Sequence, residues 1–270
     1  TYIRPGFLAE EFQFRLGWSE TVARPDLREV SASTYIDPLT EARVRGNPLL
    51  ETSDLTNYDA RAEWFWDSGD SFSISAFYKD IDNPIETVQG GATEDNVLFN
   101  FVNADTAEVY GVELEGLKSL GFMDDWVGGW IEAFYLSGNL TLSDSEIEIP
   151  PTGGVGNITN DKRAMTQQSD WVVNVQLGFD SFNGRHSANV VYNAFGERIF
   201  FAGIDGFDDA KEQPFHSIDF VYSYFPTEEV TVKLRLKNLL DEEITIEQDN
   251  VDILEQEIGV QYLLDISWEL

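Results

Sequence analysis

The sequence contains no cysteine, which excludes both a disulfide framework and a cysteine-ligated metal site. Basic residues are scarce, with 17 Lys and Arg against 49 Asp and Glu, and the formal net charge is −32 at pH 7. Such a chain repels phosphate backbones, so nucleic acid is not an expected partner. No run of 18 apolar residues is present either, so no transmembrane helix is expected.

A secretory signal is also missing, because the first residues, Thr1-Tyr2-Ile3-Arg4-Pro5, do not resemble one. We expect either that a signal was removed or that the chain is a portion of a longer protein. Aromatic residues, in contrast, are plentiful, with 19 Phe, 10 Tyr and 7 Trp. Disordered acidic chains are poor in aromatic residues, so this composition predicts a folded, β-rich protein.

Ten segments alternate apolar and polar residues with a period of two, the pattern of strands with two different faces. They lie near residues 12–18, 58–66, 72–78, 108–117, 129–142, 171–179, 188–194, 218–224, 230–236 and 258–270. No helical periodicity competes with this pattern. The sequence therefore predicts an all-β protein of about ten antiparallel strands in meander order.

The links between these segments alternate in length. Those near 67–71, 118–128, 180–185 and 226–228 are short or moderate, and those near 20–57, 80–107, 141–168, 197–214 and 241–257 are long. Outer-membrane barrels have short periplasmic turns and long outer loops. This alternation favours an up-and-down transmembrane β-barrel, with the chain end at the periplasmic face.

The seven tryptophans are predicted to lie near strand ends, where aromatic girdles form at membrane interfaces. One girdle should hold Trp64, Trp66, Trp126, Trp130 and Trp268, and the other Trp18 and Trp171. A general preference of Trp for β structure is the alternative explanation of this placement.

Period-two alternation by itself also fits a soluble antiparallel sheet with one wet face. A secreted β-sandwich binding module, for example for carbohydrate, is therefore the second hypothesis. The barrel hypothesis places one set of side chains on the lipid face: Val173, Val175, Leu177, Ile218, Phe220, Tyr222, Val232, Leu234, Val260 and Leu264. It places another set in the lumen: Asn174, Gln176, Ser217, Asp219, Lys233 and Arg235.

Several motifs carry a family resemblance. Residues 46–51 (GNPLLE), 73–85 (SISAFYKDIDNPI), 107–114 (AEVYGVEL) and 237–241 (KNLLD) resemble segments of the C-terminal half of TonB-dependent receptors, and they occur in the same order. The apolar residues at every second position up to Leu270 resemble the terminal strand of outer-membrane proteins. That strand usually ends in Phe, and Leu270 departs from the pattern.

The resemblance implies a receptor in the Gram-negative outer membrane that imports a scarce nutrient, of the siderophore, cobalamin, carbohydrate or peptide class. Family members have a plug domain inside a barrel of about 22 strands. Residues 1–270 resemble the C-terminal portion of that barrel, without a plug or TonB box. The implied partners are outer-membrane lipid and lipopolysaccharide, the substrate, and the TonB complex, which would bind an N-terminal region absent from this sequence.

No residues are predicted to be catalytic, cofactor-binding or metal-ligating. The two histidines, His186 and His216, are not in the spacing of a metal site or triad, and no nucleophile motif or phosphate loop is present. Hence an enzyme is not expected.

Two outer loops are candidates for ligand contact. Phe200, Phe201 and Phe207 lie in a predicted loop, where they either contact a substrate or fold back onto the barrel. Residues 241–257 contain eight acidic residues and no Lys or Arg. This segment is either a solvated loop or a weak site for divalent cations, which prefer carboxylate oxygens.

Overall fold

A computed structural model of the chain describes residues 1–38, 42–93, 96–149 and 158–269. Within these residues the strands form one large sheet and two four-stranded sheets. The helices are α1 (Leu27–Val30), η1 (Leu120–Met123), α2 (Asp124–Val127) and η2 (Gly129–Ala133). No helix in these described ranges has the length and apolar character needed to cross a membrane.

The large sheet is a meander in which each strand pairs antiparallel with its neighbours. Its order is β1-β2-β5-β6-β9-β10-β12-β13-β16-β17-β20, and the short β11 pairs with the end of β10. The strands are β1 (Tyr2–Pro5), β2 (Glu11–Ala23), β5 (Ser53–Phe65), β6 (Ser71–Asp82), β9 (Thr106–Ser119), β10 (Phe134–Glu148), β11 (Lys162–Arg163), β12 (Trp171–Asp180), β13 (His186–Phe195), β16 (Phe215–Tyr224), β17 (Val230–Lys237) and β20 (Gln261–Trp268). The predicted all-β meander is confirmed.

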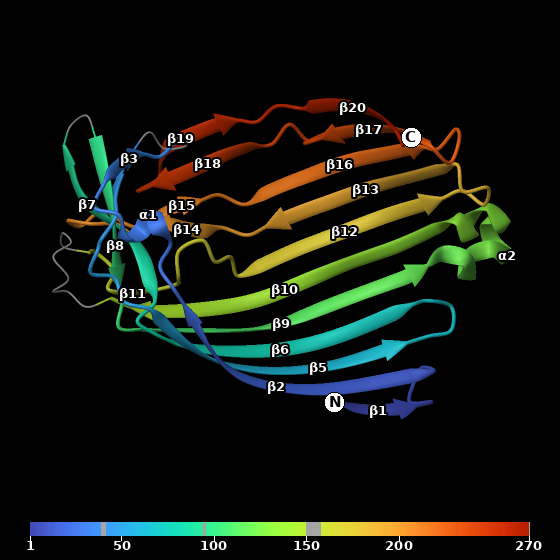
Figure 1. Cartoon of the computed structure of the whole chain (residues 1–270), viewed down its shortest axis with the longest axis horizontal. Coiled ribbons are helices and arrows are strands. Elements are labelled where there is room, and N and C mark those ends of the chain that lie inside the picture. Colours follow the sequence, from blue (N-terminus) through green and yellow to red (C-terminus); the bar gives the residue numbers. More distant parts are fainter. Residues whose placement is uncertain (39–41, 94–95, 150–157, 270) are drawn as a thin grey trace.

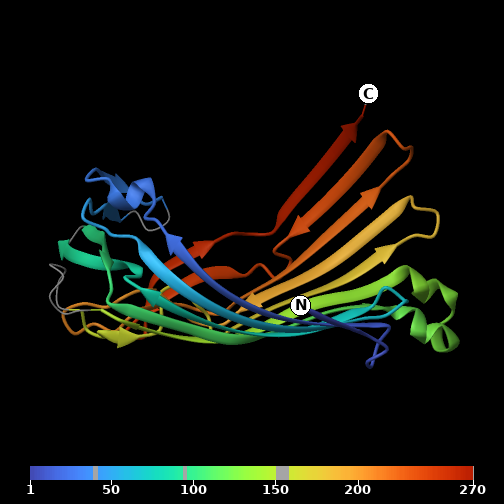
Figure 2. The same ribbon diagram turned by 60° about the horizontal axis from the view of Figure 1, so that its bottom comes forward.

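The alternation of link lengths is confirmed as well. The long links gather at one end of the sheet and the short ones at the other, at the left and right of Figure 1 respectively. We call these the loop end and the turn end. Figure 2 shows the large sheet as one curved layer that does not close on itself. A single layer is not a β-sandwich, so the second hypothesis from the sequence does not describe this fold.

Three details of the strand prediction are wrong. β1 was missed, because four residues are too few to establish a period of two. The segment predicted from residue 129 begins with η2, and β10 runs instead from Phe134 to Glu148. Val260 lies just outside β20. Leu270 lies outside the described residues, so its predicted place in the terminal strand stays a prediction.

The long links are not irregular loops throughout, as the sequence suggested. One small sheet has the order β3-β4-β8-β7, formed by β3 (Thr34–Ile36), β4 (Arg43–Arg45), β7 (Ile85–Thr93) and β8 (Asn96–Asn103). The other has the order β14-β15-β18-β19, formed by β14 (Arg198–Phe201), β15 (Ala210–Glu212), β18 (Glu243–Gln248) and β19 (Val251–Glu257). β4 and β8 pair in parallel, although they come from different links.

The register gives the large sheet two chemically different faces. Directly paired residues of an antiparallel sheet project to the same side. Leu177 pairs with Val190, which pairs with Phe220, whereas Asn174 pairs with Asn193, which pairs with Ser217. Continued through β17 and β20, this pairing places all predicted lipid-facing residues within the strands on one face and all predicted lumen-facing residues on the other. We call these the apolar face and the polar face.

Two rows of aromatic side chains cross the apolar face. Trp18, Tyr58, Tyr78 and Tyr110 are successive partners toward the loop end, and Phe12, Trp64 and Phe72 are successive partners toward the turn end. Trp18 lies within β2, five residues before Ala23, rather than at the strand end as the sequence indicated. Since Tyr58 and Trp64 are six residues apart, the rows are about 20 Å apart along β5, comparable with the apolar band of about 25 Å in outer-membrane barrels.

Candidate functional site

The two small sheets pack together at the loop end, and we call this unit the outer cap. Its hydrophobic core takes residues from both sheets, including Val44 and Phe99 from one sheet and Phe201 and Ile246 from the other. The rings of Phe99 and Phe201 have centroids 5.2 Å apart. Segments from four different long links are therefore held in one folded unit.

A second core attaches the outer cap to the large sheet. It contains Val88 of β7 and Val102 of β8, together with Ile81 of β6 and Ile147 of β10. Beside it lies a buried ion pair, in which Arg163 Nη2 is 3.1 Å from Glu86 Oε2. The hydroxyl of Thr166 donates a second hydrogen bond to the same carboxylate oxygen.

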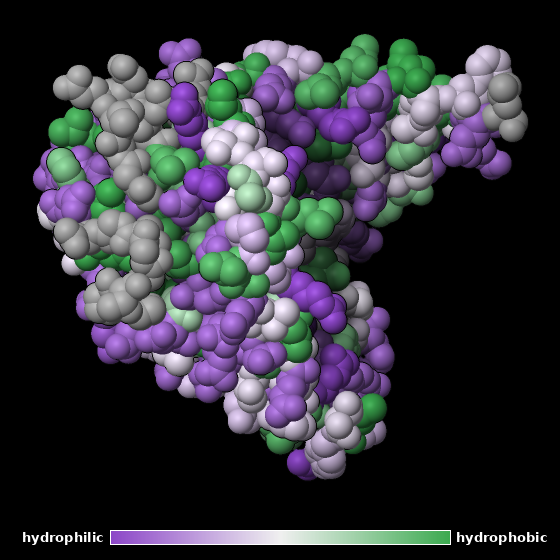
Figure 3. Space-filling view, turned by 60° about the vertical axis from the view of Figure 1, so that its left-hand side comes forward, coloured by the Kyte–Doolittle hydropathy of each residue, from purple (hydrophilic) through white to green (hydrophobic). Residues whose placement is uncertain are grey.

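An acidic cavity of about 440 Å³ lies where several outer-cap segments meet. It has five carboxylate side chains and a single ammonium group, that of Lys211. The lining residues are Asn160, Glu197, Asp208, Asp209, Lys211, Gln213, Glu247, Asp249 and Asn250. Figure 3, viewed from the loop end, shows hydrophilic residues spread over this end of the molecule, with smaller hydrophobic patches between them.

Two side chains fix the shape of the cavity. Asp209 is buried and accepts hydrogen bonds from the backbone N–H of Gly203 at 2.8 Å and from the amide of Asn160 at 3.0 Å. Lys211 is ion-paired with Glu197 at 2.6 Å, and their hydrogen bond raises the pKa of Lys211 above its ordinary value. The carboxylates and amides of this cavity suit a ligand with hydroxyl or N–H donors and disfavour an anion.

The three candidate phenylalanines occupy different environments. Phe201 is buried in the outer-cap core, and Phe200 packs against that core. Phe207 is 59% exposed and directly precedes Asp208 and Asp209, which line the acidic cavity. Phe200 and Phe201 therefore lie in β14 and not in a loop as predicted, whereas Phe207 is exposed beside the cavity.

The acidic segment 241–257 contains the hairpin of β18 and β19. Its carboxylates are spread along two strands, and the described residues contain no group of three or more potential ligands suited to a metal ion. The two histidines have different partners. His186 Nδ1 contacts the hydroxyl of Tyr222, and His216 Nδ1 contacts the hydroxyl of Tyr192. Of the residues in this hairpin segment, Glu247, Asp249 and Asn250 line the acidic cavity.

The polar face carries a chain of ion pairs across β2, β5 and β9. Glu63 is 2.8 Å from Arg15 and 3.0 Å from Arg61, and Arg61 is 2.7 Å from Glu115. Glu63 itself is buried beneath them. These charges project from the face opposite the aromatic rows, as expected for a hydrated lumen.

A match to a protein-family model identifies the class of protein. The antiparallel meander, with its opposed faces and sorted links, has the architecture of part of a membrane β-barrel. The family model described as "TonB dependent receptor-like, beta-barrel" matches residues 2–239. The chain belongs to this family of TonB-dependent receptors, as the motifs in the sequence indicated.

Solved structures share the fold at low sequence identity. A mutant of the ferric enterobactin receptor from Pseudomonas aeruginosa is 15% identical, with a TM-score of 0.62 over 97% of this chain and 38% of that one. The siderophore receptor PirA from Pseudomonas aeruginosa is 17% identical, with a TM-score of 0.58 over 95% and 39%. The copper transporter OprC is 14% identical, with a TM-score of 0.64 over 98% and 38%. A comparison with curated proteins gives no match.

The aligned share of this chain is much larger than the aligned share of each solved structure. Nearly all of this chain aligns, yet it spans only about two-fifths of the length of the structures it matches. The acidic cavity was not foreseen from the sequence, because its residues come from segments near 160, 197, 210 and 248. Only folding of the outer cap brings them together.

Proposed function

We propose that this chain is the C-terminal portion of the barrel of an outer-membrane receptor that imports a scarce nutrient with energy supplied through TonB. The observation that carries the proposal is the division of one meander into an apolar and a polar face, in a chain that belongs to this family. An apolar face exposed over successive strands is stable against lipid hydrocarbon, and the charged face is stable against water.

The free edges of β1 and β20 support the domain assignment. An unpaired strand edge costs several kcal/mol per polar group in hydrocarbon, so a spanning sheet must be closed. We infer that residues 1–270 close with further strands of the same receptor into a barrel of about 22 strands around a plug domain. The plug would contact the TonB complex, and the apolar face would contact phospholipid and lipopolysaccharide.

The outer cap is the proposed site of first ligand contact. The siderophore, cobalamin, carbohydrate and peptide classes remain the candidate substrates, and the acidic cavity favours a ligand that presents hydroxyl or N–H donors. Phe207 offers an exposed aromatic surface in the segment that leads into this cavity. Binding would need no catalytic residue, because the energy would come through TonB.

The test is an uptake experiment with the full-length receptor. A strain that lacks the receptor gene is supplied with labelled ferric siderophore, cobalamin, oligosaccharide or peptide, with and without a plasmid carrying the full-length gene. We expect one substrate class to accumulate only with the plasmid, and only when TonB is intact. Accumulation that persists without TonB, or a protein absent from the outer-membrane fraction, would contradict the proposal.

A further inference from the structure

The aromatic row nearer the turn end has a gap. Phe12 pairs with Trp64, and Trp64 with Phe72, with ring centroids 5.2 and 5.9 Å apart. The next partners in the same row are Gly116 of β9 and Gly138 of β10, followed by Val175 of β12. Two adjacent strands therefore present bare backbone to the apolar face at the depth where their neighbours present rings.

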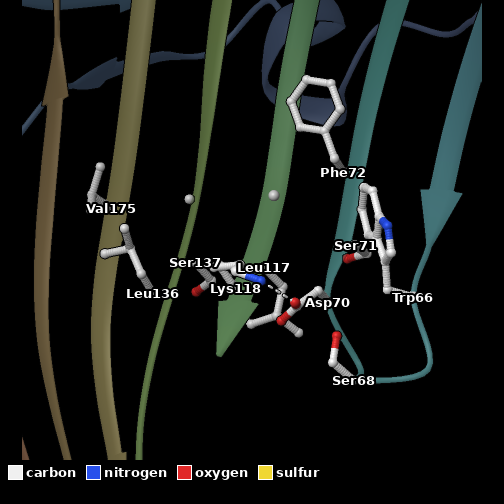
Figure 4. Close-up of a pocket in the computed structure, with 12 residues that line it drawn as sticks. Trp66, Ser68, Asp70, Ser71, Phe72, Leu117, Lys118, Leu136, Ser137 and Val175 are labelled. Atoms are coloured by element: carbon white, nitrogen blue, oxygen red, sulfur yellow. Dashed lines mark hydrogen bonds and ion pairs between the residues drawn. The ribbon is translucent and has the colours of Figure 1, made fainter. Parts of the chain in front are cut away.

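This gap is the floor of a groove of about 640 Å³, a volume within the range of about 300–1,000 Å³ typical of small-molecule sites. Phe72 and Trp66 lie on one side of it, and Leu136 and Val175 on the other (Figure 4). A Cβ atom at residue 116 would meet only ordinary contacts, the nearest at 3.6 Å. The groove thus has room for a side chain at residue 116, whereas a Cβ atom at residue 138 would lie 2.7 Å from the backbone oxygen of Asn174.

A cation lies at the turn end of the groove. Lys118 pairs with Leu136 and so belongs to the apolar face. Its ammonium is ion-paired with Asp70 (Figure 4) and lies 5.3 Å from the centre of the Phe122 ring. The Lys118 side chain is 53% exposed, whereas that of Asp70 is 7% exposed. The ammonium has three donors, and those not used by Asp70 remain for a second anion.

We propose that this groove binds one glycerophospholipid, with an acyl chain on the Gly116 and Gly138 backbone and the phosphodiester against Lys118. The inference rests on the proposed function, because the apolar face meets lipid only if the barrel spans the outer membrane. In that topology the turn end is periplasmic, and the lipid belongs to the periplasmic leaflet. Charge complementarity selects the headgroup position, since a lysine that reaches the interface from an apolar face attracts phosphate.

The experiment uses the full-length receptor purified in detergent and titrated with dioleoylphosphatidylethanolamine, with the bound lipid counted by native mass spectrometry. Gly116→Leu fills the groove, and Ala76→Leu places the same leucine side chain at an exposed position of the same face, outside the groove. We expect Gly116→Leu to weaken binding about tenfold and Ala76→Leu to leave it unchanged. Equal affinities of wild type and Gly116→Leu would overturn the proposal.

The charge is tested separately from the groove. Lys118→Gln should weaken binding about tenfold, and Lys118→Arg should restore it, because the arginine keeps the charge next to Asp70. Dioleoylglycerol, which has the same chains and no phosphate, should bind as weakly to wild type as phosphatidylethanolamine binds to Lys118→Gln. Equal binding of the two lipids by wild type would show a purely apolar groove and contradict the headgroup assignment.

Membrane insertion is measured on the same proteins, by outer-membrane fractionation and by the shift of unheated samples in gel electrophoresis. A wild-type receptor that does not reach the outer membrane would refute the proposed function. A receptor that is inserted but binds the lipid no differently in wild type and Gly116→Leu would refute only this inference.

Discussion

Arg163 Nη2 lies 3.1 Å from Glu86 Oε2, and the two side chains are only 3% and 2% exposed. These residues are 77 positions apart in the chain, in the β11 and β7 segments of two different long links. The guanidinium also donates to the backbone carbonyl of Ala164 at 2.8 Å. A buried ion pair thus joins the outer cap to β11, which pairs with the end of β10.

Removal of one partner of this pair should destabilise the outer cap strongly. Glu86→Gln leaves the buried guanidinium without its counter-charge, a change that typically costs about 3–5 kcal/mol. We expect faster amide hydrogen exchange across β7 and β8, with the large sheet unaffected. The matched control is Glu146→Gln, which breaks the exposed Lys162–Glu146 pair and should change exchange little. Similar effects of both variants would contradict this prediction.

The ring of Tyr135 covers Gly178, its cross-strand partner. A Cβ atom at residue 178 would lie 2.0 Å from the ring, so Gly178→Ala must displace Tyr135 from its hydrogen bond with Asn189. We expect a loss of about 1–3 kcal/mol, as for other overpacked sites, measured by denaturant unfolding in detergent. Gly17→Ala, whose Cβ would have only ordinary contacts from 3.5 Å, is the control and should be nearly neutral.

Asp70 should make the stability of the turn end depend on pH. Burial would raise its pKa, but hydrogen bonds from Lys118, the Ser119 backbone and Ser68 outweigh burial and hold the pKa of Asp70 below its ordinary value. A lowered pKa in the folded state means that the stabilisation is complete above the ordinary aspartate pKa of about 4. It is then lost as the pH falls through the folded pKa.

The measurement compares wild type with Asp70→Asn. The difference in unfolding free energy should be constant near neutral pH and shrink below about pH 4, as the wild-type carboxyl group becomes protonated. A difference in unfolding free energy that grows on acidification would contradict a lowered pKa of Asp70 in the folded state.

Phe201 and Phe207 should respond oppositely to truncation. Phe201→Ala leaves a cavity in the outer-cap core, which typically costs about 3–5 kcal/mol, and should expose the cap to protease. Phe207→Ala removes an exposed ring and should leave protease resistance unchanged. Under the proposed function, Phe207→Ala lowers uptake of the identified substrate. Normal uptake by this variant would remove Phe207 from the ligand-contact surface.

Assembly should depend on which face of the terminal strand receives a charge. Trp268 pairs with Val230 on the apolar face, and Ser267 pairs with Thr231 on the polar face. We expect Trp268→Asp combined with Leu270→Asp to block insertion, because these positions resemble the signal by which barrels are recognised. Ser267→Asp should assemble normally. Quantitative outer-membrane fractionation tests this prediction. Wild-type levels of the double variant would contradict the hypothesis that the terminal strand carries the insertion signal.

The sequence alone determined the two faces and the order of most strands of the large sheet. Alternation with a period of two follows directly from strand geometry, so the residues of each strand reveal its two faces before any partner is known. Leu177 and Gln176 could therefore be assigned to opposite faces, and the link lengths could be sorted to two ends. β1 was missed because four residues carry too little periodicity.

Only the tertiary structure decided what the long links do. The core that joins Phe99 to Phe201, the Arg163–Glu86 pair and the acidic cavity all depend on contacts between segments far apart in the chain. Similarly, Gly116 and Gly138 are unremarkable in sequence, and they form a groove only because the register sets them side by side. The alternation with a period of two describes a single strand. A site formed by several strands depends on the register between them, and that register is fixed by the packing of the whole sheet.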